Sequence, residues 1–237
     1  MRINSLVELG ALAREVVVLS AEESHHLARV LRVRVGQELV LFDGRGGVAE
    51  AVLETVSKTA VEARILKQWQ EPPPAVEIHL IQAVPKPDRW ELVLQKAVEL
   101  GVTHIQPILT QHTEFRPNPK KQARWDKVIR NAAQQCEVRW LPTLQPLTKF
   151  PAILPALSDY DLVLVGSLYE GTIPLHDAPI RGKKKVALLI GPEGDFSPEE
   201  VAEAQAAGGV SVSFGKRILR TETAAIFGLS ILAYELF

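Results

Sequence analysis

Residues 188–200, LLIGPEGDFSPEE, constrain the fold of this chain more than any other stretch. An apolar run over 186–190 stops at Gly191-Pro192, and Ser197 and Glu200 stand three residues apart shortly afterwards. A short apolar run bounded by Gly and Pro is typical of a buried parallel strand. Ser followed by Glu at this spacing predicts a capping box at a helix start. We therefore expect an α/β fold whose loop faces a ligand, because such sheets bind ligands beyond the carboxyl ends of their strands.

The composition is that of an ordinary globular protein, with 46% hydrophobic and 23% charged residues. A length of 237 residues is enough for one large or two small domains. The single cysteine, Cys136, excludes an intramolecular disulfide and a cysteine-based zinc cluster, which favours a reducing compartment. No apolar run approaches the roughly 18 to 20 residues of a membrane span, and the first residues lack a signal-peptide h-region. We expect a cytoplasmic protein without membrane contact.

The first part of the chain is predicted to be a small β-rich domain. The pattern predicts a helix over 21–31, with Leu27, Val30 and Leu31 on one face. Glu71 and the three prolines after it cannot continue a sheet, so a domain boundary is expected there. We expect a barrel-like domain over residues 1–70. Its strands are predicted at 16–19, 38–42, 48–56 and 59–66.

Alternating strands and helices follow, the pattern of a mostly parallel sheet, and predict an α/β domain over 75–237. One helix is expected to open at Asp88 and end before Gly101. The last helix is apolar on nearly every side, so it should be buried on every side, in a dimer interface or deep in the core. The predicted strands are 76–83, 105–109, 161–166, 185–190 and 210–214, and the helices are 89–100, 120–135 and 223–234.

Standard catalytic motifs are missing. The Gly191 loop lacks the Gly-Lys-Ser/Thr of a P-loop, and no GxGxxG follows a strand. A nucleophilic role for Cys136 is less expected than a structural one. The histidines show no metal-ligand spacing, so the sequence predicts no metal site; they are His25, His26, His79, His104, His112 and His176.

A second loop, 214–224, gathers charge before the last helix. Thr221 or Thr223 can cap that helix, but capping does not explain three cations at an end where the helix dipole disfavours them. A bound polyanion or an anionic transition state would relieve that crowding. Two other stretches are locally basic on a chain of net charge −1: one contains Arg29, Arg32 and Arg34, and the other contains the cations of 112–139. Such patches suit a polyanion that is contacted at particular places. A solvated helix face explains the second run equally well. The cations of the loop are Lys216, Arg217 and Arg220.

With both loops considered, the sequence resembles the RsmE family of 16S ribosomal RNA uracil-N3 methyltransferases, in the SPOUT superfamily. The match covers most of the chain. It rests on residues 25–27, 30–32, 41–44, 95–101, 190–194 and, above all, 218–224.

The resemblance implies a PUA-like RNA-binding barrel followed by a SPOUT domain with a deep trefoil knot, acting as a homodimer. It implies S-adenosylmethionine as cofactor, no metal, and 16S ribosomal RNA or the 30S subunit as partner. The cofactor would be held by Val165, Gly166, Leu189, Ile190, Gly191, Glu193, Gly194, Phe214, Gly215, Ile218, Leu219, Thr221 and Thr223. RNA would be held by Arg29, Arg32, Arg34, Lys86, Arg89 and Arg116.

The chemistry of methyl transfer to uracil N3 leads to hypotheses for the roles of two residues. Uracil N3 is a poor nucleophile until its proton leaves, so charge on O2 and O4 must be stabilised. We expect Arg220 to supply that stabilisation and Glu222 to orient it or to accept the proton.

The chain departs from the family pattern in two places. Where the family usually has Glu-Gln followed by Ser-Gly-Arg, near the end of the middle helix, this chain has Gln134-Gln135-Cys136-Glu137-Val138-Arg139. The N-terminal opening, of the Arg-Arg-Phe type in the family, is reduced to MRIN. Two alternatives stay open. One is a SPOUT enzyme acting on tRNA or on a ribose 2′-hydroxyl, and the other is a non-catalytic RNA-binding assembly factor.

Overall fold

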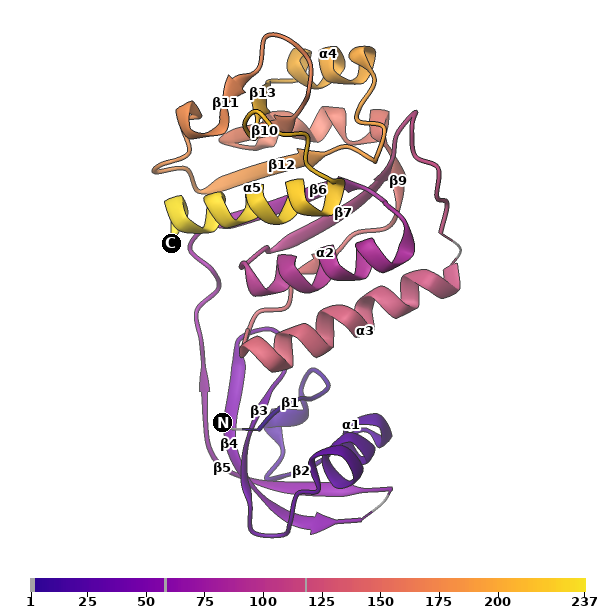
Figure 1. Ribbon diagram of the computed structural model, residues 1–237. Helices are drawn as coiled ribbons and strands as arrows, with labels where there is room; N and C mark the ends of the chain where they lie inside the picture. Colours follow the sequence, from indigo (N-terminus) through magenta and orange to yellow (C-terminus); the bar gives the residue numbers. More distant parts are fainter. Residues whose placement is uncertain (1–2, 58, 118) are drawn as a thin grey trace. The chain divides into compact units, whose positions relative to one another are not determined.

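The computed structural model describes residues 3–57, 59–117 and 119–237. The chain divides into two compact units (Figure 1). Unit 1 comprises the residues up to Pro73 together with Ala133–Leu141, and unit 2 comprises Pro74–Ala132 and Pro142–Phe237. The end of the middle helix therefore belongs to unit 1, although it lies far along the chain.

Unit 1 is built on a five-stranded sheet in the order β1-β3-β4-β5-β2. β1 runs parallel to β3, and the other pairs are antiparallel. Asp43 shapes the turn between β3 and β4, because its carboxylate accepts hydrogen bonds from the backbone N–H groups of Arg45 (2.7 Å) and Gly47 (2.9 Å). The strands are β1 (Asn4–Leu6), β2 (Val16–Val18), β3 (Glu38–Phe42), β4 (Gly47–Val56) and β5 (Val61–Gln70), and a 3₁₀ turn covers Ala11–Ala13.

The predicted helix over 21–31 is two segments, α1 (Ala21–His25) and a π-helix (His26–Leu31). Leu27 is fully buried, whereas Val30 and Leu31 are 61% and 46% exposed. The three residues, predicted to lie on one face, therefore differ in burial. A π-helix has wider turns than an α-helix, so side chains three and four residues apart no longer line up.

Unit 2 contains an eight-stranded sheet in which every pair of strands is parallel, as predicted. The order is β11-β13-β10-β12-β6-β7-β8, with β9 also beside β7. Three of the strands have two residues each, too few for a readable pattern. The strands are β6 (Glu77–Ala83), β7 (His104–Leu109), β8 (Thr143–Leu144), β9 (Thr148–Lys149), β10 (Leu162–Gly166), β11 (Ile173–Pro174), β12 (Lys185–Ile190) and β13 (Gly209–Ser213).

Four α-helices accompany this sheet: α2 (Pro87–Glu99), α3 (Pro119–Cys136), α4 (Pro198–Ala206) and α5 (Thr221–Leu236). The capping box predicted for Ser197 and Glu200 is present. The start predicted at Asp88 is wrong, since α2 begins at Pro87 after Lys86 as N-cap. Proline suits the first helical position because its φ is already fixed near the helical value. Short 3₁₀ segments cover Phe150–Ala152, Leu154–Asp159 and Leu175–Asp177.

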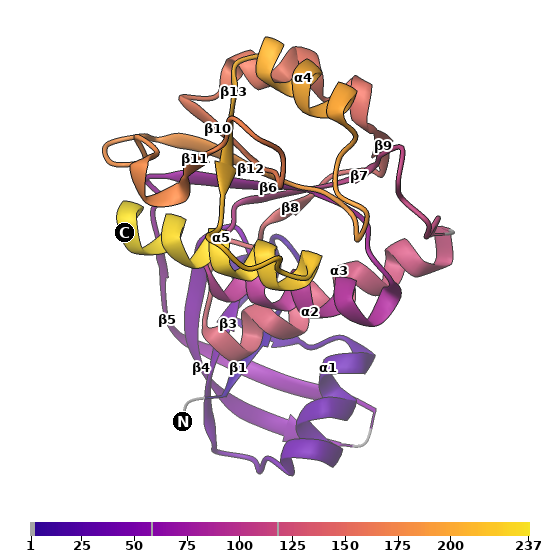
Figure 2. The same cartoon turned by 45° about the horizontal axis from the view of Figure 1, so that its top comes forward.

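The sheet of unit 2 lies between two layers of helices. α5 packs on β12 and β6 and against α2, whereas α4 packs by β13 on the opposite face (Figures 1 and 2). Side chains alternate along β6 accordingly. Ile81 and Ala83 join a core with Phe150 and Phe196, and Gln82 faces α5.

One face of α5 is exposed in the single chain. Phe227 is 41% and Tyr234 is 80% exposed, whereas Ala225, Leu229 and Leu232 are buried. A deep core position for the whole helix is therefore excluded. No helix among the described residues is long and apolar enough to cross a membrane.

Candidate cofactor and active site

Three loops surround one cavity of about 540 Å³ in unit 2. They follow β10, β12 and β13, whose carboxyl ends meet at one edge because the strands are parallel. Of the residues singled out by sequence, the lining includes Arg89, Gly166, Ile190, Gly191, Glu193, Phe214, Gly215, Ile218, Leu219, Arg220 and Thr221. Lys216 and Arg217, which the sequence singled out for their charge, also line it. The lining includes further residues that the sequence did not mark: Ser167, Leu168, Thr172, Pro192, Asp195, Ser213 and Ala224.

Other candidate residues lie beside this cavity, outside its lining. Val165 and Leu189 are completely buried in the core of the sheet. Gly194 lies against His112, whose Nδ1 is 3.1 Å from the Gly194 carbonyl oxygen. Thr223 is exposed on the first turn of α5. These four residues were assigned from the family resemblance, which does not say which side chains line the cavity. Val165 and Leu189 lie on strands, where successive side chains point to opposite faces of the sheet.

Two glycines at the cavity have no room for a side chain. A Cβ atom on Gly191 would lie 2.8 Å from the backbone nitrogen of Phe196, in the same loop. A Cβ atom on Gly166 would lie 2.9 Å from the Phe214 ring. A larger residue would therefore require the loop after β12 to change shape at the first place and the Phe214 ring to move at the second.

Asp195 ties the loop after β12 to the loop after β10. Its carboxylate accepts hydrogen bonds from the backbone N–H groups of Phe196 (2.8 Å) and Leu168 (3.1 Å). Burial raises the pKa of Asp195 above its usual value, and these two hydrogen bonds oppose that rise. The residue itself has a φ of 59°, which belongs to the left-handed region. The sequence offered no signal for this role beyond the position of Asp195 after Gly194.

Thr221 joins the two loops that the sequence singled out. Its hydroxyl donates to the Gly191 carbonyl at 2.7 Å and accepts from the Gln82 side-chain amide at 2.9 Å. All of these contacts are buried. Thr221 is therefore not the helix cap; Arg220 occupies that position, and its side chain makes no capping hydrogen bond.

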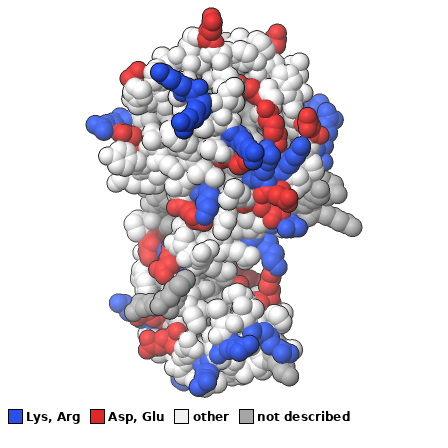
Figure 3. Space-filling model, in the orientation of Figure 1, with Lys and Arg blue, Asp and Glu red and all other residues white. Residues whose placement is uncertain are grey.

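Charged groups of both signs surround Arg89, which lines the cavity. Glu222, a predicted catalytic residue, is not part of that lining. Arg89 Nη1 lies 3.7 Å from Glu193 Oε1 and 3.7 Å from Glu222 Oε2. No hydrogen bond from the described residues reaches this buried oxygen of Glu222. Arg220, like the other loop cations, is exposed. Figure 3 likewise shows basic and acidic side chains intermingled on one face of unit 2.

The predicted RNA-binding residues lie in both units. Arg29, Arg32 and Arg34 are exposed on unit 1, at and after the π-helix, and Arg32 has a φ of 53°. Lys86 and Arg116 are exposed on unit 2.

The two places where the chain departs from the family pattern meet inside unit 1. Arg139 donates to the Asn4 side-chain oxygen at 3.0 Å, and Asn4 donates to Glu137 at 3.2 Å. The Arg139 guanidinium also lies 5.1 Å from the centroid of the Phe42 ring. The N-terminal residues Met1 and Arg2 lie outside the described residues. The two departures are thus one connected structural feature.

Comparison with known families agrees with this architecture. Residues 71–233 match an RNA methyltransferase domain, and residues 19–66 match an RNA methyltransferase PUA domain. The family matches therefore follow the order of the β-rich and α/β parts of the chain.

Individual relatives agree as well. Ribosomal RNA small subunit methyltransferase E of Mycobacterium bovis is 31% identical over 236 residues, covering 96% of this chain and 88% of that protein. A methyltransferase of Legionella pneumophila, solved with bound S-adenosylmethionine (SAM), is 32% identical with a TM-score of 0.91, covering 100% of this chain and 98% of that one. Ribosomal RNA small subunit methyltransferase E of Neisseria gonorrhoeae, also bound to S-adenosylmethionine, is 32% identical with a TM-score of 0.85, covering 98% and 96%. The chain belongs to the ribosomal RNA small subunit methyltransferase E family.

Proposed function

We propose that this protein methylates N3 of a uracil in the RNA of the small ribosomal subunit, using S-adenosylmethionine. The observation that carries the proposal is the cavity at which the Gly191 loop and the 214–224 loop meet, held together by the bond from Thr221 to Gly191. In this proposal, residues 75–237 form a SPOUT domain with a trefoil knot, and residues 1–70 form a PUA-like barrel that binds RNA. A cytoplasmic location follows from that substrate.

The cavity fits such a cofactor. Its volume of about 540 Å³ lies within the range of about 300 to 1,000 Å³ found for small-molecule sites. Ile190, Phe214 and Leu219 supply apolar surface for a base, and backbone groups of the glycine-containing loops supply donors and acceptors. Four of the predicted cofactor residues lie outside this lining and would act indirectly, by holding the loop backbones in place: Val165, Leu189, Gly194 and Thr223.

When bound, S-adenosylmethionine supplies an electrophilic methyl group. The task of the protein is to turn uracil N3 into a nucleophile. Arg220, at the start of α5, is proposed to stabilise the charge that spreads onto O2 and O4 as the N3 proton leaves. Glu222 is proposed to accept that proton, because one of its carboxylate oxygens is buried without a hydrogen bond from the described residues. Arg89, 3.7 Å from this oxygen, would hold the carboxylate in position.

Exposed cations of each unit are proposed to contact RNA. Arg29, Arg32 and Arg34 of unit 1 and Lys86, Arg89 and Arg116 of unit 2 would contact phosphates, which position the RNA without reading its sequence. Reversing the three unit 1 charges should weaken RNA binding and flatten its dependence on salt. Unchanged affinity and salt slope would contradict this role.

A homodimer is proposed to cover the exposed face of α5. Phe227 and Tyr234 are both exposed and stand seven residues apart, so they lie on the same side of α5. Apolar surface that is gathered in this way marks interaction sites. A symmetric pair of α5 helices would bury both copies of this face.

The test of the activity is incubation with methyl-labelled S-adenosylmethionine and small ribosomal subunits, followed by nucleoside analysis. N3-methyluridine is the expected product. A ribose methyl group, or transfer only to tRNA, would establish the first alternative, and no transfer despite RNA binding would establish the assembly factor.

The roles within the site are tested with Arg220→Ala. We expect kcat to fall by roughly 10² to 10³, with little change in cofactor affinity. Arg14→Ala is the matched control, because Arg14 is also exposed but lies outside the cavity lining. Wild-type turnover by Arg220→Ala would rule out the assignment.

A further inference from the structure

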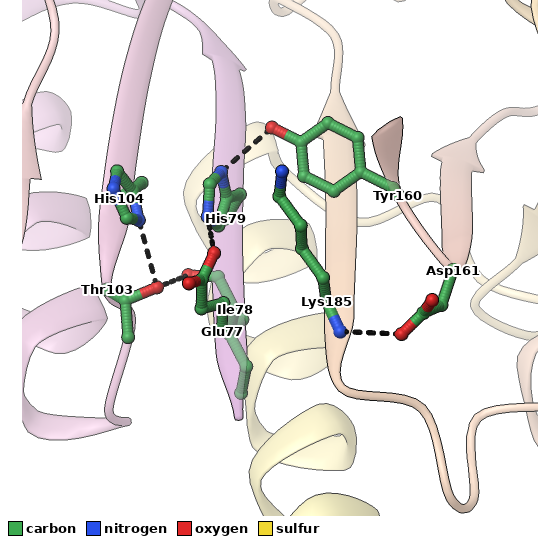
Figure 4. Close-up of polar contacts among 8 residues, drawn as sticks. All are labelled: Glu77, Ile78, His79, Thr103, His104, Tyr160, Asp161 and Lys185. Carbon is green, nitrogen blue, oxygen red and sulfur yellow. Dashed lines mark hydrogen bonds and ion pairs between the residues drawn. The ribbon is translucent and has the colours of Figure 1, made fainter. Parts of the chain in front are cut away.

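A second group of chemically capable side chains lies at the opposite edge of the unit 2 sheet (Figure 4). Glu77 and His79 are two residues apart on β6, so their side chains point to the same face. His104 begins β7 and is the register partner of His79. All three lie near the amino-terminal ends of parallel strands, whereas the cofactor cavity lies beyond the carboxyl-terminal ends. The register of two strands, and not the spacing along the chain, brings this group together.

These side chains present a donor set that suits a transition-metal ion. One potential ligand atom from each of Glu77, His79 and His104 lies within 4.8 Å of the others. Two imidazoles and one carboxylate match the nitrogen and oxygen ligands of Zn²⁺, and three protein ligands leave a fourth, tetrahedral position for water. The two rings stack, with centroids 3.9 Å apart and planes at 25°. A modest rotation of one ring is therefore needed for both lone pairs to converge.

The Thr103 hydroxyl determines which tautomer the His104 ring adopts. The Thr103 hydroxyl donates to the Ile78 carbonyl at 3.1 Å, so its oxygen is left to accept from His104 Nδ1, also at 3.1 Å. This hydrogen bond selects the tautomer of His104 whose Nε2 carries a lone pair. Such an outer hydrogen bond is the usual companion of a metal-bound histidine.

Tyr160 gives His79 the same kind of support. Its hydroxyl is 2.8 Å from His79 Nδ1, and His79 Nε2 is 3.2 Å from Glu77 Oε2. A phenol can donate or accept. In the tautomer of His79 that carries its proton on Nδ1, the Nδ1–H group donates a hydrogen bond to the Tyr160 oxygen. Nε2 then has a lone pair for a metal ion, and the ring stays neutral.

Two further charged groups border the cluster. Lys185 Nζ lies 4.9 Å from the centroid of the Tyr160 ring, so its positive charge opposes a cation here. The Asp161 carboxylate accepts hydrogen bonds from the backbone N–H groups of Lys184 and Lys185, at 2.8 and 2.9 Å. The Glu77 side chain is 48% exposed, which gives an ion access from solvent.

We propose that Glu77, together with Nε2 of His79 and Nε2 of His104, binds one Zn²⁺-type divalent ion that clamps the starts of β6 and β7. The site is separate from the methyl-transfer cavity and does not rest on the proposed function. Its effect would be on the stability of the sheet.

The test is calorimetric titration of the full-length protein with Zn²⁺, in a Cys136→Ser background that removes a competing thiol. One ion per chain is expected to bind. His79→Gln and His104→Gln should each abolish this binding, and Tyr160→Phe should weaken it about tenfold. Lys185→Gln should strengthen it roughly three- to tenfold, because a like charge is removed.

The control is His25→Gln with His26→Gln, a pair of exposed histidines on unit 1, which should leave the titration unchanged. Melting in EDTA checks that each variant is folded, and the Lys185→Gln result does not depend on the histidine variants. Zn²⁺ binding that survives both His79→Gln and His104→Gln, or a background protein that binds none, overturns the proposal.

Discussion

The Thr221 hydroxyl donates a hydrogen bond of 2.7 Å to the carbonyl oxygen of Gly191, thirty residues earlier in the chain. This bond joins the first turn of α5 to the loop after β12. Both groups are buried, and the same hydroxyl accepts from Gln82. One side chain thus links the loop after β12 to the start of α5, at the end of the 214–224 loop.

Replacing Thr221 with Val should therefore damage both stability and cofactor binding. The change keeps the shape but leaves the Gly191 carbonyl and the Gln82 amide without their partner, which costs about 1–3 kcal/mol. Denaturant unfolding and calorimetric titration with S-adenosylmethionine measure the two effects. Thr221→Ser retains the hydroxyl and should recover most of both. Equal behaviour of the Val and Ser variants would show that the hydrogen bond is unimportant.

Glu137→Gly is expected to stabilise the protein. Glu137 has a φ of 62°, directly after α3, where glycine is the favoured residue. Relief of this left-handed strain gains roughly 1 kcal/mol, while the exposed hydrogen bond from Asn4 is worth less. Thermal melting should show a higher Tm for Glu137→Gly than for Glu137→Ala, which keeps the strain. A lower Tm for the glycine variant would mean that the contacts of Glu137 outweigh its strain.

Tyr234→Asp is expected to separate the proposed dimer. Tyr234 is 80% exposed in the single chain, so an added charge harms the fold little but would be buried without a partner in an interface formed by α5. Sedimentation velocity measures the change from dimer to monomer. Leu9→Asp, at a residue 75% exposed on unit 1, is the matched control and should remain dimeric. A Tyr234→Asp protein that sediments like wild type places the interface elsewhere.

His79 should stay neutral in mildly acidic, metal-free solution. Burial, and next the adjacent His104, lower the pKa of His79 from 6.5 to about 4; Lys185 also lowers it, and Glu77 opposes the shift. The unfolded chain therefore binds a proton between these two values that the folded chain does not, so stability should fall as the pH drops from about 6.5 to about 4. Proton NMR of the imidazole gives the pKa directly. The free energy of unfolding should differ less between pH 7 and pH 5 for His79→Gln than for wild type. An ordinary histidine pKa for His79 would contradict the expected effect of burial.

The sequence by itself predicted much of the local structure. The apolar run before Gly191 and the Ser197–Glu200 capping box were recognisable because strand burial, helix capping and turn formation depend on residues a few positions apart. The alternation of strands and helices likewise predicted a parallel sheet correctly. The π-helix was not predicted, because a helical pattern of side chains does not reveal which backbone hydrogen bonds form.

Tertiary structure decided the relationships between distant residues. Asp195 bridges two loops by hydrogen bonds. Thr221 does not cap α5 but links its first turn to the Gly191 loop. Arg89 lies between Glu193 and Glu222. His79 and His104 showed no relationship along the chain, yet strand register makes them neighbours. The physical reason is the same in each case. Sequence patterns report the period of a single element, whereas these contacts depend on the order and register in which separate elements pack.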